Sequence, residues 1–159
     1  TLKGAATRYI ENLSETGIAG TVPVNTVGAN GGQGSTPKWI FRANLNYETP
    51  TFSGTVTGRG VSAGKYLANA IECTSGCPTS TSQFPTYDNN HVSGLFYVDL
   101  NLTQKVSVTS GSEAEFFFNV TNLFDADPLL LPETGLAATS TYSDLFGRTF
   151  RVSVRFNTR

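Results

Sequence analysis

The sequence is poor in the residues that most catalytic and metal-binding sites use. It contains no methionine, one histidine, two cysteines and one tryptophan, and charged side chains make up 14% of its 159 residues. One histidine without a Cys/His cluster argues against a zinc site of the usual ligand spacing. A net charge of −1 argues against a nucleic-acid binder, which needs a basic surface to neutralise phosphates, and against a polybasic membrane-surface helix.

The sequence also lacks long apolar runs and a leader-like start. No run approaches the ~20 apolar residues that a membrane-spanning helix needs. There is no initiator methionine, and no charged start is followed by the apolar stretch of a signal peptide. The chain opens at Thr1 with a strand-like pattern already under way. We therefore expect a processed chain or a fragment, and treat residues 1–159 as one unit.

What the sequence does contain is a period of two. Between Phe96 and Leu102 apolar residues alternate with Tyr97, Asp99 and Asn101. Such alternation is typical of strands with two unlike faces. It predicts six strands, at residues 2–11, 39–48, 52–61, 94–108, 114–124 and 148–156.

The connections between these strands alternate between short and long. Two are tight, at 49–51 and 109–112, whereas those at 12–38, 62–93 and 125–147 are long and rich in Gly, Ser, Thr, Asn and Pro. Compact soluble domains rarely carry three structureless loops of that length. Outer-membrane barrels combine short periplasmic turns, long extracellular loops and alternating strands. We therefore predict an all-β, antiparallel up-and-down meander of about six strands that belongs to a transmembrane β-barrel. A soluble β-sandwich has the same period and stays the alternative.

Several stretches resemble TonB-dependent outer-membrane receptors. Residues 114–125 read AEFFFNVTNLFD and look like the penultimate barrel strand of that family, which ends in an Asn-Leu-Phe-Asp type motif. Residues 142–156 read YSDLFGRTFRVSVRF and look like its last strand. The run PKWIFRANLNY at 37–47 resembles an earlier strand, and a short Cys-to-Cys loop such as 73–77 also occurs in some members.

The resemblance implies that residues 1–159 are the C-terminal segment of a receptor barrel, without its plug domain and earlier strands. Such receptors sit in the cell outer membrane and import a scarce ligand, such as a ferric siderophore, a vitamin or an oligosaccharide. The implied partners are the missing barrel and plug, a periplasmic TonB-type energy-coupling protein, outer-membrane lipid and the small ligand, but no nucleic acid. The chain departs from the family in one respect, because Asn157, Thr158 and Arg159 follow the aromatic Phe156 that would end the barrel.

The polar residues of the strands are the candidates for a ligand path through the barrel. The polar residues nearest the long loops are expected to line the ligand path. The remaining polar residues are expected to face water inside the barrel. The candidates on the strands are Arg42, Asn44, Arg59, Tyr97, Asp99, Asn119 and Arg151. The candidates in the extracellular loops are Tyr87, His91 and Tyr142. Aromatic residues near the loops, Trp39 among them, are alternatively anchors at the membrane interface.

Catalysis finds little support, and no catalytic residue, cofactor or metal is predicted. The single histidine, His91, lies in a polar stretch without a nucleophile motif nearby, and neither Gly-x-Ser-x-Gly nor His-Glu-x-x-His occurs. In an oxidising compartment Cys73 and Cys77 are better explained by a local disulfide than by a two-thiolate metal site. Asp88, Asp125, Asp127 and Glu133 lack the spacing of a calcium loop and fit turn-forming roles better.

Three other functions remain as alternatives. A passive outer-membrane pore would share the barrel but need no plug. A soluble all-β carbohydrate-binding module would bury Phe96, Val98, Leu100 and Leu102. A hydrolase would place His91 in a pocket.

Overall fold

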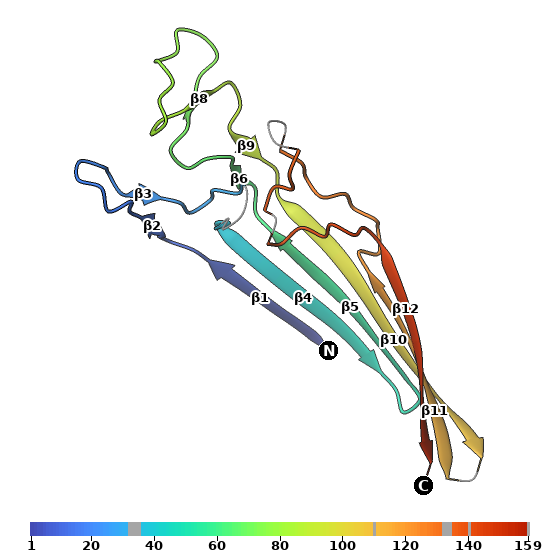
Figure 1. The fold of residues 1–159 in the computed structure, drawn as a ribbon. Coiled ribbons are helices and arrows are strands. Elements are labelled where there is room, and N and C mark those ends of the chain that lie inside the picture. Colours follow the sequence, from blue (N-terminus) through green and yellow to red (C-terminus); the bar gives the residue numbers. More distant parts are fainter. Residues whose placement is uncertain (32–35, 110, 132–134, 140, 159) are drawn as a thin grey trace.

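The computed structural model describes residues 1–31, 36–109, 111–131, 135–139 and 141–158. Within these ranges the chain is all-β, with no helix. Six long strands form one antiparallel sheet in the order β1-β4-β5-β10-β11-β12 (Figure 1). They are β1 (Leu2–Arg8), β4 (Trp39–Glu48), β5 (Phe52–Val61), β10 (Leu95–Thr109), β11 (Ser112–Thr121) and β12 (Thr149–Thr158). The predicted all-β class and the six-stranded antiparallel meander are confirmed.

Strand ends differ from the prediction where a local turn intervenes. The first strand was expected to reach residue 11 and stops at Arg8, and the fifth was expected to reach residue 124 and stops at Thr121. The fifth ends because Asn122 has a positive φ of 55°, which turns the chain out of the sheet. The last strand continues past Phe156, since Asn157 pairs with Glu113. Asn157 is therefore part of the sheet, while Arg159 lies outside the described residues.

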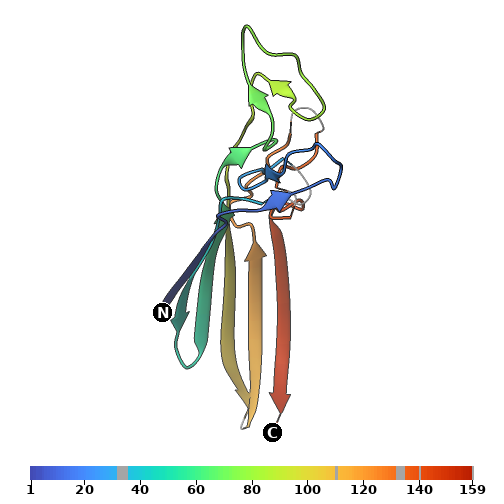
Figure 2. The same ribbon diagram turned by 90° about the vertical axis from the view of Figure 1, so that its left-hand side faces the viewer.

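The two ends of the sheet are unlike. Both short turns lie at one end, and the three long connections lie together at the other (Figures 1 and 2). In the β4–β5 turn, the Thr49 hydroxyl accepts a hydrogen bond from the Phe52 amide at 2.9 Å. The alternation of connection lengths therefore predicted the arrangement of the loops correctly.

The long connections are more regular than expected. They carry three two-stranded sheets, in which β2 (Leu13–Ser14) pairs with β3 (Val24–Asn25), β6 (Gly64–Lys65) with β9 (His91–Val92), and β7 (Ile71–Glu72) with β8 (Thr86–Tyr87). Each strand has only two residues, which is too short for the period of two to stand out in the sequence. The prediction of structureless loops was wrong in this respect.

The two faces of the large sheet differ in charge. Because partners across neighbouring strands share a face, the register assigns every strand residue to one side. The polar face carries Lys3, Arg42, Asn44, Glu48, Arg59, Asp99, Lys105, Glu113, Glu115, Asn119, Arg151 and Arg155. Among the described strand residues of the opposite, apolar face, Arg8 is the one charged side chain.

The apolar face is largely uncovered. Large side chains on it remain exposed, with Val152 at 73% and Phe156 at 71% of their full accessible area. Other exposed members are Phe41, Leu45, Tyr47, Phe96, Phe116, Phe118, Phe150 and Val154. No described segment forms a second sheet against this face. The sandwich alternative therefore does not describe this fold, and Phe96 is not buried as a soluble module would require.

The buried core lies where the loops meet the polar face. Val61, Leu95 and Tyr97 form one cluster, against which Leu129 and Tyr142 of the last long connection pack. A second cluster joins Val92, Leu131 and Ala138 within the loops themselves. The burial that orders the chain is thus concentrated at the loop end of the sheet, and this places the 125–147 connection over the polar face.

Candidate functional site

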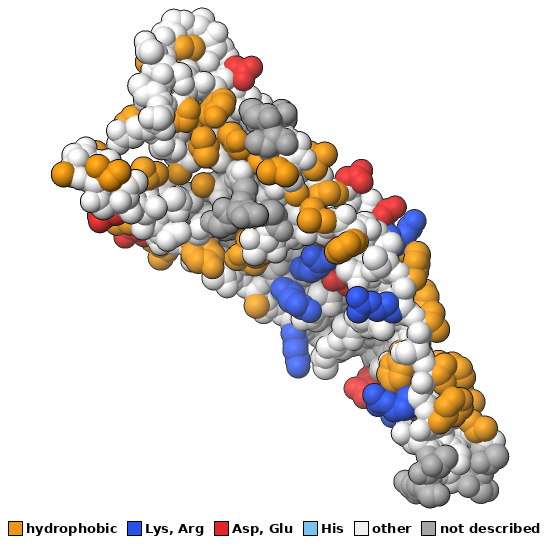
Figure 3. All heavy atoms as spheres, in the orientation of Figure 1, with side chains coloured by type: hydrophobic (Ala, Val, Ile, Leu, Met, Phe, Trp, Pro, Cys, Tyr) orange, Lys and Arg blue, Asp and Glu red, His pale blue; other side chains and the backbone are white. Residues whose placement is uncertain are grey.

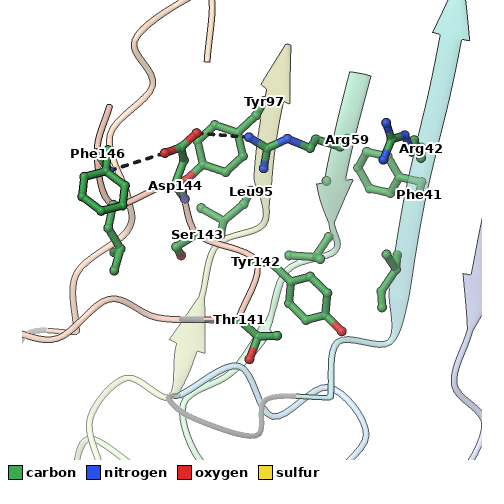
Figure 4. Close-up of a pocket in the computed structure, with 14 residues that line it drawn as sticks. Phe41, Arg42, Arg59, Leu95, Tyr97, Thr141, Tyr142, Ser143, Asp144 and Phe146 are labelled. Atoms are coloured by element: carbon green, nitrogen blue, oxygen red, sulfur yellow. Dashed lines mark hydrogen bonds and ion pairs between the residues drawn. The ribbon is translucent and has the colours of Figure 1, made fainter. Parts of the chain in front are cut away.

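A cavity of about 490 Å³ lies on the polar face at the loop end of the sheet (Figure 4). Its wall comes from β4, β5 and β10, and its other side from the segment 141–146 of the last long connection. The strand residues that line it include Ile40, Arg42, Arg59, Val61, Leu95 and Tyr97. The loop residues include Tyr142, Asp144 and Phe146. The site therefore depends on packing between strands and a loop that are far apart in sequence.

Arg59 is the centre of an ion-pair network on this wall. Its Nε lies 2.9 Å from Asp99 Oδ2 on the neighbouring strand β10, and its Nη2 lies 3.1 Å from Asp144 Oδ2 in the loop. Asp144 is the least exposed of the three, with 10% of its side chain accessible. Two carboxylates thus neutralise the charge of one guanidinium. Arg59 is therefore not available as a free cation for a ligand, and its pair with Asp144 attaches the loop to the sheet.

Tyr97 strengthens the same attachment. The Arg59 guanidinium lies over its ring, 4.8 Å from the ring centre, and its hydroxyl accepts a hydrogen bond from the Asp144 amide at 3.2 Å. The ring is buried, with 2% exposure. A cation over an aromatic face adds about 0.5–2 kcal/mol, depending on desolvation. Tyr97 therefore acts from beneath the cavity as a support for Arg59 and Asp144.

Asp99 also fixes the turn that follows β11. Its Oδ1 accepts a hydrogen bond from the backbone amide of Asn122 at 3.0 Å. The Asn122 side chain is fully buried and bonds both the amide and the carbonyl of Ala126, each at 2.9 Å. Asparagine tolerates the left-handed backbone better than most residues and supplies both a donor and an acceptor. These two requirements explain the asparagine at the end of this strand.

The run 122–125 and the run 147–148 meet in space. Asp125 Oδ1 accepts a hydrogen bond from the Arg148 amide at 2.8 Å, and the Arg148 guanidinium lies 3.8 Å from Asp125 Oδ2. Gly147 has a φ of 67°, and a Cβ there would come within 3.1 Å of Asp125 Oδ1. Leu123 adds a third link by accepting from Arg148 Nη1 at 3.4 Å. The two stretches that carry the sequence resemblance are thus the two halves of one clasp between β11 and β12.

Arg42 is the exposed cation of the cavity. It projects from β4 beside Arg59 but forms no ion pair with any described residue (Figure 4). Across the middle of the polar face Lys3 and Arg151 are likewise exposed and without an acidic partner in the described ranges. Basic side chains gather over the middle of this face in Figure 3. The wall below the cavity is therefore biased toward positive charge.

The aromatic side of the cavity comes from the loop. Tyr142 packs against the Val61, Leu95 and Tyr97 cluster, and Phe146 is 89% exposed at the cavity mouth. Burial raises the pKa of the Tyr142 phenol above its ordinary value, and the nearby Tyr9 adds to this. The phenol is therefore neutral and able to donate a hydrogen bond at physiological pH.

Five of the sequence-predicted candidates come together at the cavity and its support: Arg42, Arg59, Tyr97, Asp99 and Tyr142. Asn44 lies next to them and accepts a hydrogen bond from the Thr57 hydroxyl at 2.8 Å. Asn119 and Arg151 are register partners on β11 and β12, outside the cavity lining. Tyr87 and His91 lie apart in the 62–93 connection, where Tyr87 stacks edge-on against Tyr66 at 5.5 Å and His91 is exposed.

Sequence reasoning missed three residues of the site. Asp144 and Phe146 were interpreted only as parts of a motif, and Asn122 only as a residue of the predicted strand 114–124 and its terminal motif. The sequence feature that could have indicated Asp144 was its position as a single carboxylate in the loop before the last strand. Nothing in the sequence pairs it with Arg59, because the two are 85 residues apart.

A buried polar junction holds the three long connections together. Asn30 is fully buried; its amide donates to the Lys65 carbonyl at 2.7 Å and its side chain to the Ser62 carbonyl at 3.0 Å. Its own carbonyl accepts from the Thr139 amide at 2.8 Å. One residue of the first connection therefore contacts the second and the third. Gly31 packs beside it, since a Cβ there would overlap the Tyr66 carbonyl.

The middle connection is closed by a disulfide. Cys73 and Cys77 are bonded, with 5.6 Å between their Cα atoms. The Cys73 amide donates to the Tyr87 carbonyl at 2.8 Å, which joins the disulfide loop to β8. In the described part of the chain no group of three or more His, Cys, Asp or Glu side chains is placed to hold a metal ion. Glu133 lies outside the described residues.

The described ranges contain no helix long and apolar enough to cross a membrane. Comparison with protein-family models, with curated proteins and with solved structures finds no match. Functional inference therefore depends on the geometry itself: an uncovered apolar sheet face, and a polar face with a cavity that offers one uncompensated cation beside aromatic and apolar side chains.

Proposed function

We propose that this chain is the C-terminal part of the barrel of a TonB-dependent outer-membrane receptor, and that the whole protein binds and imports a scarce ligand. The observation that carries the proposal is the apolar face of the sheet. Its large side chains are exposed, and its strands bear no charge except Arg8 at the loop end. In water such a face would be an aggregation liability. Facing acyl chains, the same face is stabilising.

The dimensions of the apolar face fit a bilayer. From Phe96 to Val106 on β10 the apolar face covers about 34 Å of strand, at about 3.4 Å per residue, with Gln104 as its one polar member. At the usual tilt of about 40° this spans roughly 26 Å, close to the apolar band of outer-membrane barrels. Trp39 and Arg8 lie at the loop end of the face, the level where aromatic and basic residues anchor to the membrane interface.

The open edges of the sheet fit a part of a barrel. β1 and β12 each pair with one neighbour and not with each other. Free edges expose unpaired backbone groups, which are costly in a bilayer. In the proposed receptor the remaining strands of a barrel of about twenty-two pair with both edges. The polar face then lines the interior, where it meets the plug and the ligand path.

The clasp between β11 and β12 adds to the resemblance in sequence. Asp125, Gly147 and Arg148 each have a defined structural role, and all three belong to the stretches that resemble the family. A sequence resemblance supports family membership more strongly when each of its residues has a structural role. The proposed partners are the plug and earlier strands of the same protein, outer-membrane lipid, a periplasmic energy-coupling protein and a small ligand.

The proposal is tested with the intact protein in a cell that depends on it for a scarce nutrient. We expect the protein to fractionate with the outer membrane and to resist carbonate extraction. Uptake should stop when the periplasmic energy-coupling protein is deleted or the proton gradient is collapsed. Uptake that continues without energy coupling would support the passive pore instead. Recovery of the intact protein as a soluble monomer would reject both and support the carbohydrate-binding module.

The cavity gives the proposal a local test. Arg42→Gln removes the uncompensated cation at the cavity without disturbing an ion pair among the described residues. If the cavity is on the ligand path, this variant should lower ligand affinity or uptake rate several-fold while leaving the amount of inserted protein unchanged. Arg155→Gln, on the same face near the turn end, is the control for loss of an arginine away from the cavity, and it also removes the 3.3 Å ion pair with Glu115.

A further inference from the structure

The apolar face has a depression on its β1 side, where several side chains are small. A groove of about 480 Å³ runs over Gly4, Ala6, Ala43 and Gly58. Phe41 and Phe96, whose ring centres are 6.2 Å apart, form its wall. The lining is almost entirely apolar.

Small residues form the floor of this groove. On the β11–β12 side of the same face Phe118 and Phe150 stack at 6.3 Å, in the sheet rows of Gly54 and Val56. At Gly58, by contrast, a Cβ would come within 3.2 Å of the Phe96 ring, so a larger residue would displace the wall. The groove is open to its surroundings, since Gly4, Ala6 and Ala43 of its floor are exposed and Gly58 is half-buried.

An uncompensated cation lies at the loop end of the groove. Arg8 follows Ala6 on the same face of β1 and lies over the Trp39 ring, 5.6 Å from its centre. No described acidic residue pairs with it. Arg148, the residue before β12, also lies over an aromatic ring, that of Phe150, but is paired with Asp125. The basic side chain without a partner is therefore the one next to the groove.

We propose that this groove and Arg8 together bind one membrane lipid with a phosphate headgroup: an acyl chain lies in the groove and the phosphate lies against Arg8. The inference rests on the proposed function, because it takes the apolar face to be in contact with lipid. Ala6 and Gly4 lie two and four residues from Arg8 along β1, roughly 7 and 14 Å. A lipid whose phosphate contacts Arg8 would therefore place its acyl chain along Ala6 and Gly4. A cation at this level attracts anionic lipid, and an aromatic ring there anchors to the interface.

Trp39 provides the readout, because it is the one tryptophan of this chain and lies beneath Arg8. The intact protein is reconstituted in phosphatidylcholine vesicles that contain a minor fraction of phosphatidylglycerol. One lipid or the other carries dibrominated acyl chains, which quench nearby tryptophan. The Trp39 signal is the difference between the protein and its Trp39→Phe variant. We expect brominated phosphatidylglycerol to quench with an apparent binding constant about five times that of brominated phosphatidylcholine.

Two variants separate the headgroup contact from the groove. Arg8→Gln should reduce the headgroup preference to about one, whereas Lys3→Gln, on the polar face of the same strand, should leave it unchanged. Ala43→Leu fills the floor of the groove and should weaken quenching by both brominated lipids. A preference that persists in Arg8→Gln, or is absent from the starting protein, would overturn the lipid site while leaving the receptor intact. Failure of the protein to float with vesicles would overturn both proposals.

Discussion

Asp125 and Arg148, 23 residues apart, are joined by a 2.8 Å hydrogen bond from the Arg148 amide to the Asp125 carboxylate. The link fixes where the chain leaves β11 and where it enters β12. The added ion pair is partly exposed and contributes little by itself. The effect of the clasp therefore depends on the backbone hydrogen bond and on the turn that it stabilises.

Asp125→Ala should lower the free energy of unfolding by about 1–2 kcal/mol, because it removes a charge-assisted hydrogen bond to a backbone amide. The measurement is urea unfolding of the intact protein in detergent. Asp127→Ala is the control, since Asp127 is exposed in the same loop and forms no hydrogen bond or ion pair with any described residue. Equal effects of the two substitutions would show that the clasp has no special role.

Asn122 allows backbone conformation and side-chain bonding to be measured separately. Asn122→Gly keeps the positive φ but loses both hydrogen bonds to Ala126. Asn122→Ala loses the bonds and also strains the left-handed backbone, by about 1–2 kcal/mol. We expect stability to fall from asparagine to glycine to alanine in unfolding experiments. An alanine variant as stable as the glycine variant would mean that the turn relaxes out of its left-handed conformation.

Asp144 attaches the last long connection to the sheet through Arg59 and Tyr97. Asp144→Ala should therefore speed amide hydrogen exchange across residues 141–146 by several-fold, as expected for the loss of one partly buried ion pair. Exchange in β7 and β8 should not change, because those strands lie in another connection. Asp88→Ala, at an exposed loop position, is the matched control. Faster exchange in all three connections would show that they open as one unit.

The disulfide between Cys73 and Cys77 should have a local effect only. Closing so short a loop contributes about 2 kcal/mol to the stability of the segment that contains it. In a Cys73→Ser, Cys77→Ser double variant, amide hydrogens in β7, β8 and the segment between them should exchange faster. The unfolding of the large sheet should be unchanged. Loss of the sheet in the double variant would contradict this, because β7 and β8 pair with each other and not with the six long strands.

The sequence is sufficient to predict the strands but not the loops. Alternation over ten residues at Phe52–Val61 and fifteen at Leu95–Thr109 is visible, because each side chain shows which face it belongs to. In two-residue strands such as β6 and β9 no period exists to be seen. The contacts that order those strands are buried polar ones, at Asn30 and Asn90. In the sequence alone, an asparagine in a loop is indistinguishable from an ordinary turn residue, so these contacts were not predicted.

The candidate site was predictable mainly on its strand side, and Tyr142 is the one loop candidate that lies at the cavity. Arg42, Arg59 and Asp99 follow from the period of two, because that period places all three on the polar face. The distance from Arg59 to Asp144 follows from how a long connection folds back over the sheet, and loop length alone does not specify that path. Residues on strands were therefore assigned to the correct face, whereas Tyr87 and His91, chosen from loops, lie elsewhere.

The solvent on each side of the sheet can be tested with two neighbouring residues of β12. Val152 is on the apolar face and is 73% exposed, and Ser153 is on the polar face. If the apolar face meets lipid, Val152→Arg should cost about 2–4 kcal/mol, as charges do near the middle of a bilayer. Ser153→Arg should cost little, because Arg151 and Arg155 already lie on that face.

The measurement is the fraction of intact protein that folds into vesicles at increasing urea. In water an exposed valine tolerates arginine with a change of about 0.5 kcal/mol or less. Equal tolerance of the two arginine variants would therefore place the apolar face in water and reject the membrane assignment. A penalty confined to Val152→Arg requires a nonpolar medium on that side, because the two positions are adjacent on one strand and face opposite sides of the sheet.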